Sequence, residues 1–251
     1  SRIIRLAYGD DKIYTELTNN SFNFWEELSN ESERKLYDEC GMLWLVSQKD
    51  NSYIEKSKKH ISFLEKTYQL TTDLSEFEDQ AIFLEGTSSM VLDRVNKIAY
   101  TGLSPRTNES LARLWGERSG YEIVFFQTES HAGQPIYHTD VIMYIGTEIA
   151  GISMDSIKQE DRERVLEKLN LSHTILEITQ DQIMDFCGNC LEVQDKDNQL
   201  ILVMSTRAFN SYSDQQKTVL ANHFQKIIHS DITHIEEYGG GSARCMMMEL
   251  F

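Results

Sequence analysis

The sequence predicts an α/β fold assembled from repeated strand–strand–helix–strand units. From residue 88 onward, short apolar segments alternate with amphipathic helical patterns three times, at an interval of roughly 50 residues. The composition of the 251 residues, 40% hydrophobic and 25% charged, is typical of a globular protein with a sizeable core. Because such units cannot bury their apolar faces alone, we expect them to stack or to close into a propeller-like ring.

The three units share one order of elements. The first is expected to contain strands at residues 90–93 and 97–101, a helix at 108–119 and a strand at 122–127. The second is expected to contain strands at residues 141–145 and 149–154, a helix at 159–169 and a strand at 173–178. The third is expected to contain strands at residues 190–193 and 200–204, a helix at 213–226 and a strand at 227–229, with a final strand at 245–250.

The first 72 residues follow a different pattern and are predicted to form a separate, mainly helical α+β segment. Amphipathic stretches at residues 17–37 and 53–68 flank an apolar, strand-like segment at residues 42–46. We therefore place a domain boundary between residues 1–72 and residues 73–251, on this change of pattern rather than on a Gly- or Pro-rich linker.

The net charge of −16 limits the partners that the protein is expected to bind. An acidic chain argues against nucleic acid and anionic membranes and favours cationic small molecules. No apolar run approaches the roughly 18 residues of a membrane span, and no charged-then-apolar signal segment opens the sequence. Four cysteines in this composition suit a reducing compartment, so we expect a cytoplasmic protein.

Cys245 is the first candidate for chemistry. Three consecutive glycines, residues 239–241, permit positive φ and close approach of a ligand, and they lead to this cysteine at the start of an apolar run. A thiol beside Arg244 is expected to have its pKa lowered toward the nucleophilic thiolate. The alternative is a tight turn before a core strand, in which the cysteine is a small hydrophobic residue.

His138 and Asp140 form a second candidate group, and Glu85 is a further acidic candidate. At the head of a strand, residues two apart point to the same face, so His138 and Asp140 would project together with Thr139 opposite. Histidine is suited to exchange protons with a cysteine nucleophile near neutral pH, and Asp140 would orient a cationic substrate or the histidine. The alternative is the solvent-exposed start of a strand.

Cys187 and Cys190 have the spacing of a redox or zinc motif. No second cysteine pair and no histidine pair accompanies them in the sequence. We therefore interpret the pair as structural, and we expect the protein to need neither a metal nor an organic cofactor.

Five motifs occur in one order along the second part of the chain: FLEGTSSMVLDR at residues 83–94, LSPRT at 103–107, YHTDV at 137–141, Gly188-Asn189 and the run from Gly239 to Cys245. In these motifs, residues 73–251 resemble the guanidino-group-modifying enzymes, which include arginine deiminase, dimethylargininase and glycine amidinotransferase. The resemblance is closest to the bacterial citrulline-utilisation hydrolases. It implies a five-bladed α/β propeller of the pentein type, of which about three units and a final strand form an incomplete part.

The resemblance also implies roles for individual residues. Cys245 would be the nucleophile and His138 the acid and base, while Glu85 and Asp140 would hold the guanidinium group and Arg106 the substrate carboxylate. The implied activity is that of a hydrolase or transferase acting on the guanidino or ureido carbon of arginine-like or citrulline-like amino acids. The reaction would pass through a covalent thiouronium-type intermediate.

The amino-terminal segment resembles a different family. Residues 1–9, with Arg2 and Arg5, and the Cys40-Gly41-Met42-Leu43 stretch are similar to monomeric sarcosine oxidase and N-methyltryptophan oxidase. An FAD-dependent amine oxidase ranks last among the functions, because no G-x-G-x-x-G fingerprint is present. An inactive chimeric or truncated fragment, or a binding module, remains an alternative, and open sheet edges would favour self-association.

Overall fold

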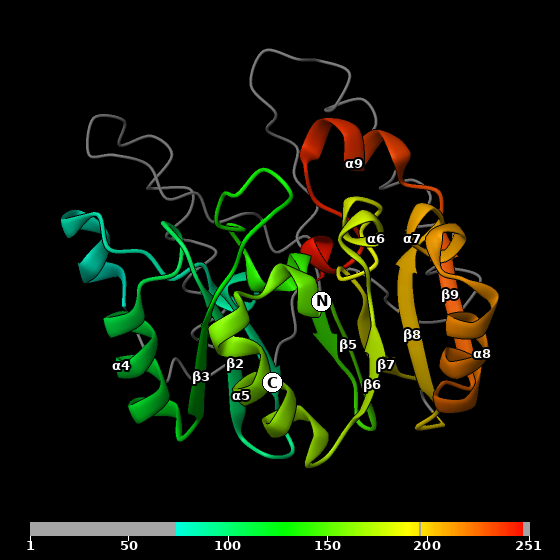
Figure 1. The fold of residues 1–251 in the computed structure, drawn as a ribbon, viewed down its shortest axis with the longest axis horizontal. Helices are drawn as coiled ribbons and strands as arrows, with labels where there is room; N and C mark the ends of the chain where they lie inside the picture. Colours follow the sequence, from blue (N-terminus) through cyan, green and yellow to red (C-terminus); the bar gives the residue numbers. More distant parts are fainter. Residues whose placement is uncertain (1–73, 196, 248–251) are drawn as a thin grey trace, which may run out of the picture. The chain divides into compact units, whose positions relative to one another are not determined.

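The computed structural model describes residues 74–195 and 197–247, and these residues form a mixed α/β structure with three small sheets. Each sheet has three strands, of which the first two are antiparallel and the third lies parallel to the second. The three units follow one another across the molecule in chain order (Figure 1). The predicted fold class and the repeated ββαβ unit are therefore confirmed.

The elements of the three units lie close to their predicted positions. The first unit contains β1 (Met90–Asp93), β2 (Ile98–Leu103), α4 (Glu109–Ser119) and β3 (Glu122–Gln127). The second contains β4 (Met143–Ile145), β5 (Ile149–Ile152), α5 (Gln159–Asn170) and β6 (Thr174–Glu177). The third contains β7 (Leu191–Gln194), β8 (Leu200–Ser205), α7 (Thr206–Ser211), α8 (Asp214–His223) and β9 (Lys226–Ser230).

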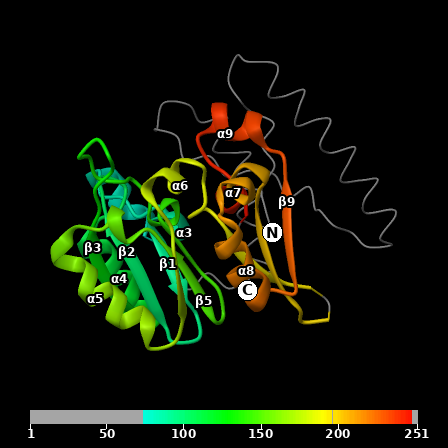
Figure 2. The same cartoon turned by 45° about the vertical axis from the view of Figure 1, so that its right-hand side comes forward.

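Short helical turns precede, connect or follow these elements. They are η1 (Ser75–Gln80), α3 (Gly86–Ser89), η2 (Thr139–Val141), η3 (Met154–Ser156), α6 (Gln180–Met184), α9 (Thr233–Gly239) and η4 (Arg244–Met246). Figure 2 shows α3 beside the start of β1, which follows it directly in the chain, and the two elements are in contact. Three of these turns, α3, η2 and η4, carry the candidate site.

Local sequence signals explain where the crossover helices begin and end. The Asn108 side chain accepts a hydrogen bond from the Leu111 backbone N–H and caps the start of α4, and Gly120 ends that helix at a φ of 73°. Ser213 and Gln216 form a reciprocal capping box at the start of α8. These caps satisfy backbone groups that a helix end would otherwise leave unpaired.

One hydrophobic core runs through all three units. The first strands of neighbouring sheets are in contact, β1 with β4 and β4 with β7, and their buried side chains join those of β5 and β8. Every residue of β5, the central strand of its sheet, is buried. A smaller cluster around Met90, Ala99 and Ala112 lies beneath α4. The core therefore supports the turns that carry the candidate site.

Several predicted boundaries are wrong, and each error has a local cause. The strand expected at 141–145 is preceded by the 3₁₀ turn η2, so only Met143–Ile145 pair as a strand. The helix expected at 213–226 ends at His223, and Lys226 already belongs to β9. The additional helix α7 follows β8 directly, because the Ser205 side chain caps it through the Ala208 backbone N–H.

The final strand expected at 245–250 does not begin at Cys245. This residue lies in the 3₁₀ turn η4, which the Met246 backbone N–H closes onto the Ser242 carbonyl oxygen at 3.3 Å. The remaining residues of the expected strand, 248–250, lie outside the described ranges.

The predictions for the amino-terminal segment also lie outside the described residues. They are the helices at 17–37 and 53–68, the segment at 42–46 and the boundary near residue 73. Within the described part of the chain, no helix combines the length and the apolar character needed to span a membrane.

Replacement of Gly188 by alanine is expected to destabilise the fold. A Cβ atom at Gly188 would overlap the carbonyl oxygen of Val141, and backbone cannot move aside as a flexible side chain can. We expect a loss of about 1–3 kcal/mol in the free energy of unfolding, measured by urea denaturation. Gly239→Ala is the matched control, because its Cβ would meet only Ile235 at 3.7 Å. Equal stability of the two variants would contradict the prediction.

Candidate active site

The five predicted site residues come from four segments of the chain. Glu85 immediately precedes α3, and Arg106 lies in the loop after β2. His138 and Asp140 lie at the start of η2, and Cys245 lies in η4. The structure brings these segments together through a small number of specific hydrogen bonds.

Thr139 anchors η2 to the first unit. Its hydroxyl donates to the Ser89 carbonyl oxygen at 2.6 Å and accepts the Gly102 backbone N–H at 2.8 Å, and all three groups are buried. The Thr139 hydroxyl therefore holds η2 against α3 and β2. His138 and Asp140 are its neighbours in the chain and are held there with it. The strand argument from the sequence was wrong in its geometry, because these residues lie in a 3₁₀ turn. The same turn nevertheless places both residues in the candidate site.

His138 and Glu85 form a close pair. His138 Nε2 lies 2.6 Å from Glu85 Oε2, and the His138 side chain is 12% exposed. Arg106 Nη1 lies 3.7 Å from the same carboxylate oxygen, and its guanidinium group stacks over the Tyr137 ring at 5.1 Å. Glu85 therefore contacts both a predicted acid–base residue and a predicted carboxylate-binding residue.

Asp140 is a buried carboxylate with one open acceptor. Its Oδ2 lies 3.7 Å from Cys245 Sγ and 3.8 Å from Arg244 Nε. Its Oδ1 is buried and has no hydrogen-bond partner among the described residues. Burial raises the pKa of Asp140, whereas the charges of Arg244 and His138 act in the opposite direction. Oδ1 is therefore an unsatisfied buried acceptor on a carboxylate that lies beside the thiol.

Cys245 is exposed to solvent, so it is not sealed in an apolar core. The protein packed around the rest of its thiol and the negative charge of Asp140 raise the pKa of Cys245. Arg244 acts in the opposite direction but contributes less. The expectation that Arg244 lowers this pKa was therefore wrong in its net direction, because burial and Asp140 outweigh it.

Asn189 joins the same cluster, although the sequence analysis assigned it no role beyond a motif match. Its side-chain amide contacts both Asp140 and Cys245. Thr139 and Arg244 were likewise not predicted as site residues. The contacts of these three residues were not predictable from the sequence, because they join positions that are far apart along the chain.

The structure agrees with the structural interpretation of Cys187 and Cys190. Both are buried, and burial raises the pKa of Cys187 to about 12. The Tyr212 hydroxyl donates to the Cys187 carbonyl oxygen at 2.6 Å. Among residues 74–195 and 197–247, no group of three or more His, Cys, Asp or Glu side chains is placed to hold a metal ion.

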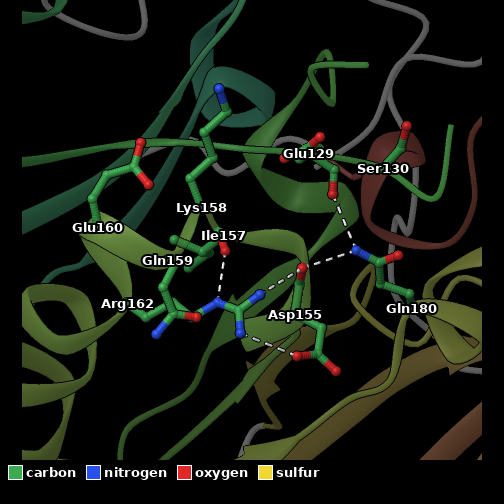
Figure 3. Close-up of a pocket in the computed structure, with 9 residues that line it drawn as sticks. All are labelled: Glu129, Ser130, Asp155, Ile157, Lys158, Gln159, Glu160, Arg162 and Gln180. Atoms are coloured by element: carbon green, nitrogen blue, oxygen red, sulfur yellow. Dashed lines mark hydrogen bonds and ion pairs between the residues drawn. The ribbon is translucent and has the colours of Figure 1, made fainter. Parts of the chain in front are cut away.

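A surface hollow lies apart from this cluster, between the second unit and α6 (Figure 3). Arg162 donates there to the carbonyl oxygens of Ile157 and Asp155 at 2.8 and 3.1 Å. Gln180 donates to the carbonyl oxygens of Glu129 and Asp155. These side chains are engaged in holding loops together, and none of the five predicted site residues lines the hollow.

Comparison with known proteins places this α/β fold of ββαβ units in the guanidino-group-modifying superfamily. The family profile of eukaryotic N,N-dimethylarginine dimethylhydrolases matches residues 40–251. The chain belongs to this family. No curated protein matches the sequence.

Solved structures show the same fold. One of them is ArgZ, an arginine dihydrolase of the ornithine-ammonia cycle in cyanobacteria. The N-terminal domain of its cysteine-to-serine variant, bound to substrate, matches this chain with a TM-score of 0.61 at 16% identity. That match covers 92% of this chain and 86% of the domain. Unliganded AgrE matches with a TM-score of 0.60 at 15% identity, over 80% of this chain and 27% of AgrE.

Apo ArgZ matches with a TM-score of 0.58 at 18% identity, over 76% of this chain. The chain covers 27% of the length of that protein. At these identities the likeness establishes the pentein-type fold and leaves the activity to be argued from the residues.

Cys245 is expected to react selectively with chloroacetamidine, whose cationic amidine suits a site containing Asp140. Because the pKa of Cys245 is raised above its ordinary 9.0, the labelling rate should increase with pH up to and beyond that value. Cys187 and Cys190 are buried and should react far more slowly. Peptide mapping after timed labelling measures the selectivity, and equal labelling of Cys245, Cys187 and Cys190 would contradict the prediction.

Proposed function

We propose that the chain is the catalytic part of a cysteine-dependent hydrolase that acts on the guanidino carbon of arginine or an N-methylated arginine. One observation carries the proposal. An exposed thiol, that of Cys245, lies 3.7 Å from a buried carboxylate, Asp140, whose second oxygen has no partner among the described residues. This pair suits a planar cation that offers N–H donors to the carboxylate and a carbon atom to the thiol.

Electrostatics favour a guanidinium group over a neutral ureido group. The substrate would donate to Asp140 Oδ1 while Arg244 stays beside Oδ2, and a charge-assisted hydrogen bond is stronger than a neutral one. The bound cation would also offset the Asp140 charge that raises the pKa of Cys245, so binding would promote formation of the thiolate. Glu85 would offer its second oxygen to the same group, and Arg106 would bind the substrate carboxylate.

The chemistry then follows from the assigned groups. The Cys245 thiolate attacks the guanidino carbon, and the bond from that carbon to the leaving nitrogen breaks as His138 transfers a proton to it. The amine leaves and a thiouronium group remains on the sulfur. Water attacks the same carbon, His138 accepts its proton, and the carbon–sulfur bond breaks to release a ureido product. Glu85 would hold the His138 ring through Nε2 during both steps.

An amidinotransferase is the second candidate, since it also forms a thiouronium group on the sulfur. In that reaction the bond from the guanidino carbon to the alkyl-bearing nitrogen breaks, ornithine leaves, and an acceptor amine attacks the carbon in place of water. A ureido substrate such as citrulline is the alternative on the substrate side. The segment resembling an amine oxidase, at residues 1–70, has no role in this proposal.

A substrate panel tests the proposal. The purified chain is incubated with L-arginine, asymmetric dimethylarginine or citrulline, with and without glycine as an amine acceptor. Ammonia, dimethylamine, ureido products, ornithine and guanidinoacetate are quantified, and acid-quenched samples are analysed by peptide mass spectrometry. A hydrolase should release amine without glycine and carry a transient adduct on Cys245. Ornithine and guanidinoacetate that form from L-arginine only with glycine would establish the transferase, and the absence of any adduct or product would reject both.

A further inference from the structure

The side chain of Asn189 connects the cysteine turn to the η2 turn. Its Oδ1 accepts the backbone N–H groups of Arg244 and Cys245 at 3.0 and 3.2 Å. Its Nδ2 donates to the Asp140 carbonyl oxygen at 3.1 Å and to Cys245 Sγ at 3.1 Å. All four contacts involve segments that carry the proposed nucleophile or the proposed guanidinium-binding carboxylate.

The surroundings determine which end of the amide faces the sulfur. Two backbone N–H groups point at one end of the amide, and only an oxygen can accept them. The nitrogen must therefore occupy the other end, where it meets a carbonyl oxygen and the thiol. Asn189 is 2% exposed, so water does not compete for these hydrogen bonds.

The backbone before Asn189 is shaped to allow this approach. Gly188 packs so closely on the Val141 carbonyl group that a Cβ atom would overlap it. The chain therefore passes directly against the segment that follows Asp140, and the next side chain reaches both turns. The motif Gly188-Asn189 thus has a physical explanation. The glycine lets the backbone pass close to Val141, and the asparagine side chain can then reach both turns.

We infer that Asn189 is a further catalytic residue, which donates an N–H to the sulfur of Cys245, stabilises the thiolate before attack and holds the sulfur beside Asp140. The catalytic meaning of this contact rests on the proposed function. The contact itself concerns the free protein, so it is testable without a substrate. A donor to an anionic sulfur stabilises the charged form and lowers the pKa of Cys245, in opposition to burial and the Asp140 charge.

The test compares Asn189→Asp with Asn198→Asp, which makes the same chemical change at an exposed turn residue. The Asn189→Asp variant keeps one oxygen that can accept the two backbone N–H groups. Its second oxygen, which is negatively charged, replaces the amide N–H group that donates to the sulfur. The rate of Cys245 alkylation by iodoacetamide is measured against pH by peptide mass spectrometry, and thermal melting checks the fold. In Asn189→Asp we expect the midpoint of the alkylation rate against pH to rise by about one pH unit or more. This shift corresponds to about tenfold slower alkylation at pH 8.

The control variant should keep the wild-type midpoint. A folded Asn189→Asp protein with an unchanged midpoint would overturn the inference, whatever its turnover. If that variant does not fold, the wild-type protein decides the question by NMR. The side-chain amide signals of Asn189 should then titrate with the Cys245 thiol and should lose this titration in Cys245→Ser. Amide signals that do not respond to the thiol would equally overturn the inference.

Discussion

Replacement of Cys245 by serine is expected to lower kcat by about 10³-fold or more, because an alcohol at this position is a much weaker nucleophile than a thiolate. Asp140 and Arg106 remain in the variant, so the substrate should still bind. The expected result is therefore a loss of kcat with little change in the dissociation constant of arginine or its methylated derivative. Steady-state kinetics and calorimetric titration measure the two quantities separately.

Cys187→Ser is the matched control for this variant. Cys187 Sγ donates to the Ala208 carbonyl oxygen, and a serine hydroxyl can make the same hydrogen bond. The control should keep its turnover and lose some thermal stability, because a buried sulfur is replaced by a more polar group. Turnover that survives in Cys245→Ser would reject Cys245 as the nucleophile.

Replacement of Asp140 by asparagine is expected to change turnover and thiol reactivity in opposite directions. The variant loses the charge that would hold the guanidinium group, so kcat/KM should fall by about 100-fold or more. It also loses the charge that contributes to the raised pKa of Cys245, so neutral iodoacetamide should alkylate the thiol faster at neutral pH. The two measurements together separate substrate binding from activation of the thiol.

Asp197→Asn makes the same change at an exposed position and should alter neither quantity. A parallel fall in turnover and in alkylation rate in Asp140→Asn would contradict the prediction. That result would show that the carboxylate supports the thiolate rather than opposing it.

The repeat of strands and helices was predictable from the sequence because it depends on local patterns. The β3 strand, Glu122–Gln127, was predicted at its observed bounds, since its apolar residues follow a helix that Asn108 begins and Gly120 ends. The predicted boundaries of helices and strands were wrong where side chains form hydrogen bonds with backbone groups. Ser205 starts α7 directly after β8, and this helix is too short for its periodicity to be recognised.

The candidate site was predictable only in part. Cys245, His138, Glu85 and Asp140 are of the types that nucleophilic and acid–base chemistry requires, and their motifs are present in the sequence. Their relation to one another was not predictable. The approach of His138 to Glu85 depends on the Thr139 hydroxyl, which joins η2 to Ser89 and Gly102 across 37 to 50 positions of the chain.

The sequence by itself determined the class of fold, the order of its elements and the residues able to perform chemistry, because short-range periodicity and side-chain type are local properties. Only the tertiary structure decided the charge balance at Cys245. Burial and the approach of Asp140 raise the pKa of Cys245, against the effect expected from its sequence neighbour Arg244. Only the fold showed the donor from Asn189, 56 positions away in the chain, because folding alone brings that amide to the sulfur.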